Sequence, residues 1–213
     1  MSMGLVARQF ADPHGVLGWL IGRGMARSNG DFSRWAVLQM QQHLKQPPRR
    51  IVEIGPGPGI GLEELLRRFP QAQVWGIDRS PEMLRQSRRR NRGAVDAERL
   101  SLVQGDVSAV RDLASVDLVA ANHVLYFWRD PQQVLTTIRE CLGPGGSIAV
   151  GYQLRQNMPG FAQKQFPREG FRLYDSEREV EALLEAAGFL GISHHVKGPA
   201  DRVEGWLGLA ATA

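Results

Sequence analysis

The chain has 213 residues, of which 43% are hydrophobic and 23% are charged, a composition that fits a folded globular protein and excludes a largely disordered one. No apolar run reaches the roughly 18 to 20 residues that cross a bilayer, and no signal-type segment opens the chain, so we expect a cytoplasmic protein. A single cysteine, Cys141, excludes an internal disulfide and a multi-thiolate metal site, and we expect no metal.

The first 48 residues contain an apolar stretch that glycines interrupt, and a helix is expected over residues 32–44, before two prolines. We interpret residues 1–48 as an N-terminal helical cap over a site and residues 49–213 as the main part of one compact domain. A weak membrane-surface contact or a homodimer contact is the competing interpretation of the cap.

From about residue 50, short β-branched runs alternate with amphipathic helical segments. This alternation predicts an α/β fold in which helices cover a mainly parallel sheet. Seven strands are expected, at residues 50–54, 73–77, 100–104, 116–121, 147–152, 192–196 and 203–209.

Three helix starts have recognisable capping residues. Ser80 and Asp130 each precede a proline, which is favourable at the first helical position. Ser176 and Glu179 have the spacing of a capping box. These signals predict helices that begin after residues 80, 130 and 176.

The central feature is the run Ile-Val-Glu-Ile-Gly-Pro-Gly-Pro-Gly-Ile-Gly at residues 51–61, a buried strand followed by a glycine-rich turn and a helix. Such a turn lets the backbone approach a ligand at the carboxyl edge of the sheet. The dinucleotide fingerprint fails, because Ile60 stands where its third glycine belongs. A phosphate loop fails as well, because no Gly-Lys-Ser/Thr follows and two prolines lack N–H donors. Glu53 would repel a pyrophosphate but suits a ligand with an ammonium and a sulfonium group.

Polar residues also follow the next three strands. Asp78, 23 residues after Gly55, is placed to accept hydrogen bonds from both ribose hydroxyls. Asp106 follows the third strand, where it offers a carboxylate to an adenine amino group, and Asn122 and His123 end the fourth. Either aspartate alone could be an ordinary turn residue, but together they indicate an adenosine-containing ligand.

These motifs, in this order, resemble the class I S-adenosylmethionine-dependent methyltransferases, especially the small-molecule group that includes the ubiquinone and menaquinone methylases. The resemblance covers about residues 50–195. The segments that carry it are 52–59, 76–84, 105–107, 116–119, 142–146 and 186–189.

The resemblance implies a Rossmann-like three-layer sandwich whose seven-stranded, mostly parallel sheet has an antiparallel last strand lying between its neighbours. It also implies S-adenosylmethionine as cofactor. In that family pattern the methionine part of the cofactor lies against Glu53, Gly55, Gly57 and Gly59, with backbone contacts from Asn122 and His123 nearby. The ribose is bound by Asp78. The adenine is flanked by Arg79 and Met83, and its edge is held by Asp106 and Val107.

Methyl transfer from a sulfonium is an in-line displacement with an activated donor, so positioning can supply most of the catalysis and a dedicated base is optional. Three histidines, His123, His194 and His195, are candidate bases for a phenol or carboxylic acid acceptor. Because His194 and His195 are adjacent on an expected strand, their side chains should point to opposite faces.

Aromatic residues cluster around the expected position of the transferable methyl group, which favours a small aromatic or apolar acceptor. The candidate acceptor-binding residues are Trp19 and Met25 of the cap, Tyr126, Phe127 and Trp128 after the fourth strand, Tyr152 after the fifth, and Phe161 beyond it.

Three alternatives remain open. A catalytically silent cofactor-binding or regulatory subunit would carry the same motifs. An RNA methyltransferase would use the basic run from Arg85 to Arg92, although no aromatics interleave with it to stack bases, which favours a solvated helix face and makes nucleic acid an improbable partner. An NAD-dependent dehydrogenase ranks last, because the third glycine is missing.

Overall fold

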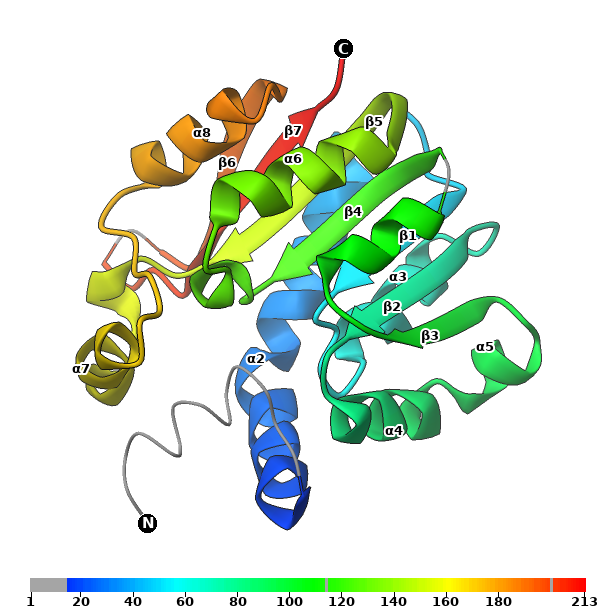
Figure 1. Ribbon diagram of the computed structural model, residues 1–213, viewed down its shortest axis with the longest axis horizontal. Coiled ribbons are helices and arrows are strands. Elements are labelled where there is room, and N and C mark those ends of the chain that lie inside the picture. The colour runs from blue at the N-terminus through cyan, green and yellow to red at the C-terminus, as the bar shows by residue number, and fades with distance from the viewer. Residues whose placement is uncertain (1–14, 114, 200) are drawn as a thin grey trace.

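A single seven-stranded sheet with the order β3-β2-β1-β4-β5-β7-β6 organises the computed structural model (Figure 1). The backbone is described for residues 15–113, 115–199 and 201–213, and the side chains from residue 29 onward within these ranges. Strands β1 to β5 run parallel, whereas β7 lies between β5 and β6 and is antiparallel to both. The expected α/β fold with an antiparallel last strand is confirmed.

The strands form where the β-branched runs predicted them. They are β1 (Arg50–Ile54), β2 (Gln73–Asp78), β3 (Leu100–Gln104), β4 (Val116–Asn122), β5 (Leu142–Tyr152), β6 (Leu190–Lys197) and β7 (Gly205–Ala211). β5 begins earlier than expected because Leu142 already pairs with Val116, ahead of a register shift.

The helices alternate with the strands along the chain. They are α2 (Gly15–His43), α3 (Ile60–Arg68), α4 (Pro81–Arg90), α5 (Arg92–Asp96), α6 (Pro131–Cys141), α7 (Gly160–Arg168) and α8 (Glu177–Ala186), with short 3-10 helices η1 (Val107–Asp112), η2 (Leu125–Phe127) and η3 (Arg155–Asn157). None of the helices in the described part of the chain is long and apolar enough to cross a membrane.

The three predicted helix starts are confirmed. Ser80 accepts a hydrogen bond from the Met83 N–H at 3.2 Å, and Asp130 accepts one from the Gln133 N–H at 2.9 Å. In the capping box before α8, the Glu179 carboxylate accepts from the Ser176 N–H at 3.2 Å. Each cap satisfies an N–H group that the first helical turn leaves without a partner.

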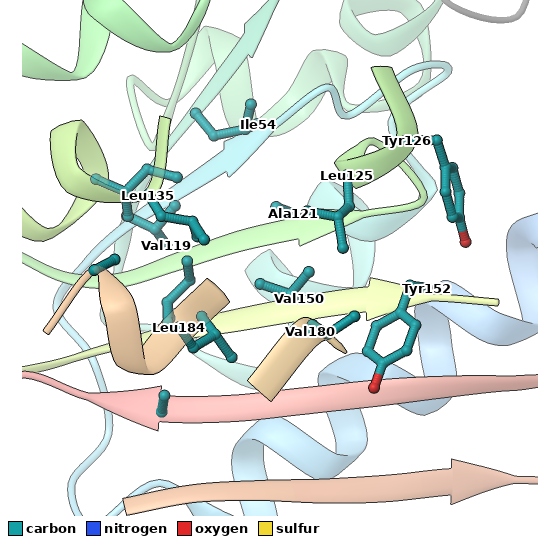
Figure 2. Close-up of a cluster of buried hydrophobic side chains, with 14 of the residues drawn as sticks. Ile54, Val119, Ala121, Leu125, Tyr126, Leu135, Val150, Tyr152, Val180 and Leu184 are labelled. Atoms are coloured by element: carbon teal, nitrogen blue, oxygen red, sulfur yellow. The ribbon is translucent and has the colours of Figure 1, made fainter. Parts of the chain in front are cut away.

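Two hydrophobic cores lie on the two faces of the sheet. On one face, α2 and α3 contribute Val37, Met40 and Leu62. On the other face, α6 packs against β5 and α8 against β6 and β7, and Figure 2 shows Val119 and Val150 beside Leu135 and Leu184. The unpaired Cys141 is buried in this second core.

Helix α2 differs from its prediction, because it begins at Gly15 rather than near residue 32. A glycine inside a helix costs only about 1 kcal/mol relative to alanine, and the segment 15–43 contains no proline to stop the helix. The side chains of Trp19 and Met25 lie outside the described residues. The proposed boundary at residue 48 stays a prediction, and Phe32 and Met40 of α2 share the core of α3.

Candidate functional site

A cavity of about 640 Å³ opens at the carboxyl ends of β1, β2 and β4, the position at which open α/β sheets bind ligands. The turn after β1 forms its floor, and α2 and the segment after β5 form its sides. Among the residues lining it are Asn29, Gly30, Ser33, Glu53, Gly55, Gly57, Asp78, Met83, Asn122, His123, Tyr126, Phe127, Asn157, Phe161 and Phe166.

The turn between β1 and α3 depends on glycine for its shape. Gly59 has a φ of 82°, and a Cβ atom there would lie 2.9 Å from the Cα of Ser87 in α4. At Gly61 a Cβ would collide with the carboxylate of Glu53. A side chain at either position would therefore push α4 or Glu53 away, so the glycines set how closely the turn packs against both.

Asp78 joins the end of β2 to this turn. Its carboxylate accepts a hydrogen bond from the Gly57 N–H at 3.0 Å and another from the Ser80 N–H at 2.9 Å. The aspartate thereby fixes the turn and the start of α4 while it lines the cavity.

Glu53 and Asn122 form a buried polar pair at the bottom of the cavity. The Asn122 Nδ2 atom donates to the Glu53 Oε1 atom at 3.4 Å. Burial raises the pKa of Glu53 to about 7, although the hydrogen bond from Asn122 acts in the opposite direction. Within the described residues, Glu53 Oε2 and Asn122 Oδ1 are buried without a partner. Both atoms can accept a hydrogen bond from a donor group of a ligand.

His123 forms the corner after β4. Its φ of 57° is left-handed, and its N–H donates to the carbonyl oxygen of Gly151 at 2.7 Å. The imidazole packs on the ring of Phe32, with 4.4 Å between centroids. Burial lowers the pKa of His123 to about 4, so the ring is neutral at physiological pH.

Aromatic rings line the opposite part of the cavity. Tyr126, Phe127, Phe161 and Phe166 all border it. Phe166 packs against Phe127 and Phe161 with ring centroids 5.5 and 6.2 Å apart, and Phe171 supports Phe127 from outside the cavity at 5.0 Å. The result is an apolar wall suited to a flat or apolar ligand.

Four of the candidate cofactor residues do not border the cavity. Gly59 packs against α4, and Arg79 is exposed after β2. Asp106 caps η1 by accepting hydrogen bonds from Ser108, which lower the pKa of its carboxyl group. Val107 follows Asp106 and packs against the core. Arg79 follows β2, and Asp106 and Val107 follow the neighbouring strand β3.

Four candidate acceptor-binding or catalytic residues also lie away from the cavity, namely Trp128, Tyr152, His194 and His195. The Tyr152 hydroxyl and His194 Nδ1 are hydrogen-bonded at 2.9 Å, whereas the His195 ring lies 4.0 Å from that of His43 in α2. The two histidines thus occupy opposite faces, as alternation along a strand predicts. Neither histidine lines the cavity, because β6 is the outermost strand of the sheet, whereas His123 does line it.

Several lining residues were not among the candidate site residues, although Phe166 lies in a connection that the sequence suggested could fold over the pocket. Asn29 lies on α2 because this helix begins earlier than expected, Ser33 lies in the predicted part of the same helix, and Gln153, Asn157 and Phe166 come from the connection after β5. The apolar composition of that connection was the available signal for Phe166. No sequence pattern marks the two asparagines.

The basic run lies on α4 and α5 rather than at the cavity. Arg85 is ion-paired with Glu82, and Arg92 with Asp96 at 3.4 Å. Arg90 donates to the carbonyl oxygen of Pro58 at 3.0 Å. Part of the run is therefore paired within the fold, which supports its interpretation as a solvated face.

Comparison with known proteins shows which family the central part of the chain resembles. Residues 52–150 match the methyltransferase domain family. Trans-aconitate 2-methyltransferase of Methylobacterium nodulans is 37% identical over 103 residues, which are 48% of this chain and 38% of that protein. The chain thus spans well under two thirds of the length of this relative.

Solved structures share the fold at lower identity. The N-methyltransferase 2 of Haemonchus contortus, in complex with phosphomonomethylethanolamine and S-adenosylhomocysteine, has a TM-score of 0.73 and 16% identity, over 100% of this chain and 60% of that one. Human N-acetylserotonin methyltransferase, in complex with S-adenosylmethionine, has a TM-score of 0.65 and 20% identity, over 89% and 53%. Residues 52–150 therefore match the methyltransferase domain family, and the chain shares its fold with these solved methyltransferases.

Proposed function

We propose that this chain binds S-adenosylmethionine along the glycine turn and transfers its methyl group to a small aromatic or apolar molecule. The observation that supports this most is the division of the cavity. Unpartnered acceptors and a left-handed glycine turn lie at one end, and four aromatic rings lie at the other.

The polar end fits the cofactor. Glu53 Oε2 and Asn122 Oδ1 would accept hydrogen bonds from the ammonium group of the methionine part, which satisfies both buried atoms. Asp78 would hold the ribose hydroxyls at the end of β2, and Met83 would pack against the adenine. Gly55 and Gly57 would let the backbone approach the ligand.

The aromatic end fits an apolar acceptor. The described residues that line the cavity include no lysine or arginine. The relatives named for trans-aconitate act on a molecule with several carboxylates, which a cationic lining would favour. Tyr126, Phe127 and Phe161 instead offer apolar area and ring edges, so we expect a different acceptor class.

Catalysis then rests on positioning. S-adenosylmethionine supplies a methyl group that is already activated by its sulfonium. Glu53 and Asp78 would fix the donor, and the aromatic wall would hold the acceptor in line with it and exclude water. His123, neutral at physiological pH, can orient an acceptor hydroxyl through a hydrogen bond without adding charge.

A screen of acceptors tests the proposal. The protein is incubated with S-adenosylmethionine and panels of phenols, quinones and carboxylic acids, and release of S-adenosylhomocysteine is measured. Turnover with the aromatic panel and none with the carboxylic acids is expected. Cofactor binding without turnover on any panel would favour the silent-subunit alternative.

A further inference from the structure

A second, polar chamber adjoins the cavity. It has a volume of about 610 Å³ and lies among α2, the segment after β5 and the β6–β7 connection. Four residues, Asn29, His123, Gln153 and Asn157, border both spaces. The two chambers therefore meet at the corner formed by His123.

The charges in this chamber are nearly balanced. Lys197 is ion-paired with Glu204, and Asp31 is ion-paired with Arg34 at 3.1 Å. Asp201 and Arg202, which carry opposite charges, complete the charged lining. The lining itself holds three acidic and two basic side chains, so it does not attract a carboxylate, and its uncharged hydrogen-bonding groups include several amides.

One of these amides lacks a partner at the junction. Asn157 Oδ1 is buried and accepts no hydrogen bond within the described residues. The neighbouring amide of Gln153 is already used, because its Nε2 atom donates to the carbonyl oxygen of Glu204 at 2.8 Å. An unpaired buried amide oxygen is costly, and an N–H or O–H donor from a ligand would satisfy it.

We propose that the polar chamber is a second subsite for the methyl acceptor, which binds a neutral hydrogen-bonding substituent of that molecule. This inference rests on the proposed function. The aromatic part of the acceptor occupies the apolar wall, and its substituent passes His123 and donates to Asn157. The acceptor class is thereby narrowed to aromatic compounds that carry a neutral amide, hydroxyl or similar group on the side opposite the methylated atom.

Three matched probes test this subsite: naphthol, hydroxynaphthamide and hydroxynaphthoate, the last two with their substituent far from the hydroxyl. Their dissociation constants are measured on the protein saturated with S-adenosylhomocysteine. The amide should bind about five to ten times more tightly than naphthol, and the carboxylate no more tightly than naphthol.

Asn157→Leu should abolish the preference for the amide, so that the amide and naphthol bind with about equal affinity. Gln133→Leu, an exposed amide on α6 that borders neither chamber, is the matched control and should keep the preference. A general loss of packing in Asn157→Leu would weaken both probes equally, so the ratio of their affinities separates the two effects.

The outcomes distinguish the two proposals. Equal binding of naphthol and the amide, or a preference that survives Asn157→Leu, would overturn the second subsite and leave the proposed function intact. If neither neutral probe binds the S-adenosylhomocysteine complex, the aromatic acceptor class is wrong and the subsite falls with it.

Discussion

The cofactor end and the acceptor end of the cavity are built in different ways. At the cofactor end, a turn of consecutive residues is fixed by backbone conformation and by hydrogen bonds from Gly57 and Ser80 to Asp78. At the acceptor end, the side chains of Tyr126 and Phe166 come from η2 and α7, which are far apart in the sequence.

The difference indicates that the two ends of the cavity tolerate substitution to different degrees. Backbone N–H groups and glycines leave little room for variation, so the cofactor end can stay constant while the acceptor changes. Side chains from separate connections can be replaced one at a time without disturbing the sheet. We therefore expect substitutions at the two ends to affect different ligands.

The largest effect is expected for Asp78→Ala. The substitution removes the proposed ribose contacts and also the acceptor for Gly57 and Ser80, so cofactor affinity should fall by about 2 to 4 kcal/mol. Titration calorimetry with S-adenosylhomocysteine measures this loss. Asp112→Ala, an exposed carboxylate on η1, should leave the affinity unchanged. An unchanged affinity in Asp78→Ala would remove the ribose assignment.

The next effect is the pH dependence caused by Glu53. Its pKa is about 7 in the folded protein, above the ordinary value of 4.5, so the folded state holds a proton that the unfolded state has lost. The stability of the cofactor-free protein should therefore fall as pH rises through this window, by at most about 1.4 kcal/mol per pH unit.

Cofactor affinity should change in the opposite direction, because the ammonium group needs the ionised carboxylate. We expect binding to strengthen as pH rises from roughly 5 to 7. Glu53→Gln should flatten both dependences, as measured by thermal unfolding and calorimetry. A wild-type slope that persists in Glu53→Gln would assign the titration to another group.

Phe161→Ala should weaken the binding of the acceptor but not that of the cofactor. Removing this ring from the apolar wall should weaken acceptor binding by about 1 to 2 kcal/mol and leave cofactor affinity intact. Phe171→Ala is the control, because Phe171 belongs to the same aromatic cluster without bordering the cavity. The effect is measured by comparing the KM for the acceptor in the two variants. An equal rise of this KM in both variants would indicate disturbed packing.

The smallest effect is expected for His123→Asn, because asparagine tolerates the left-handed backbone at this corner. A histidine with a pKa near 4 is a poor base at neutral pH, so kcat/KM should change by less than about tenfold. The pH profile of kcat/KM should also keep its shape. A loss of about a hundredfold or more would instead assign His123 to general base catalysis.

The sequence was sufficient for the features that depend on neighbouring residues. β-branched runs marked the strands, capping residues marked the starts of α4, α6 and α8, and the glycine spacing marked the turn after β1. The positions of Glu53 and Asp78 followed from parallel strands, because their carboxyl ends share one edge of the sheet.

Features that depend on long-range packing were harder to predict from the sequence. The start of α2 was missed because the glycines in its first half lower helix propensity. His194 was named for its chemistry, but the position of β6 at the sheet edge removes it from the cavity. The junction at Asn157 joins three segments whose spacing in the sequence carries no signal.

The central claim is that the turn after β1 holds a sulfonium cofactor or its demethylated product. Titration calorimetry of S-adenosylhomocysteine into the wild-type chain and Asp78→Ala, at several temperatures, tests it most directly. We predict binding at one site in the wild type and a clear loss in the variant. An absence of heat at every temperature, or equal affinity of the two proteins, would contradict the account.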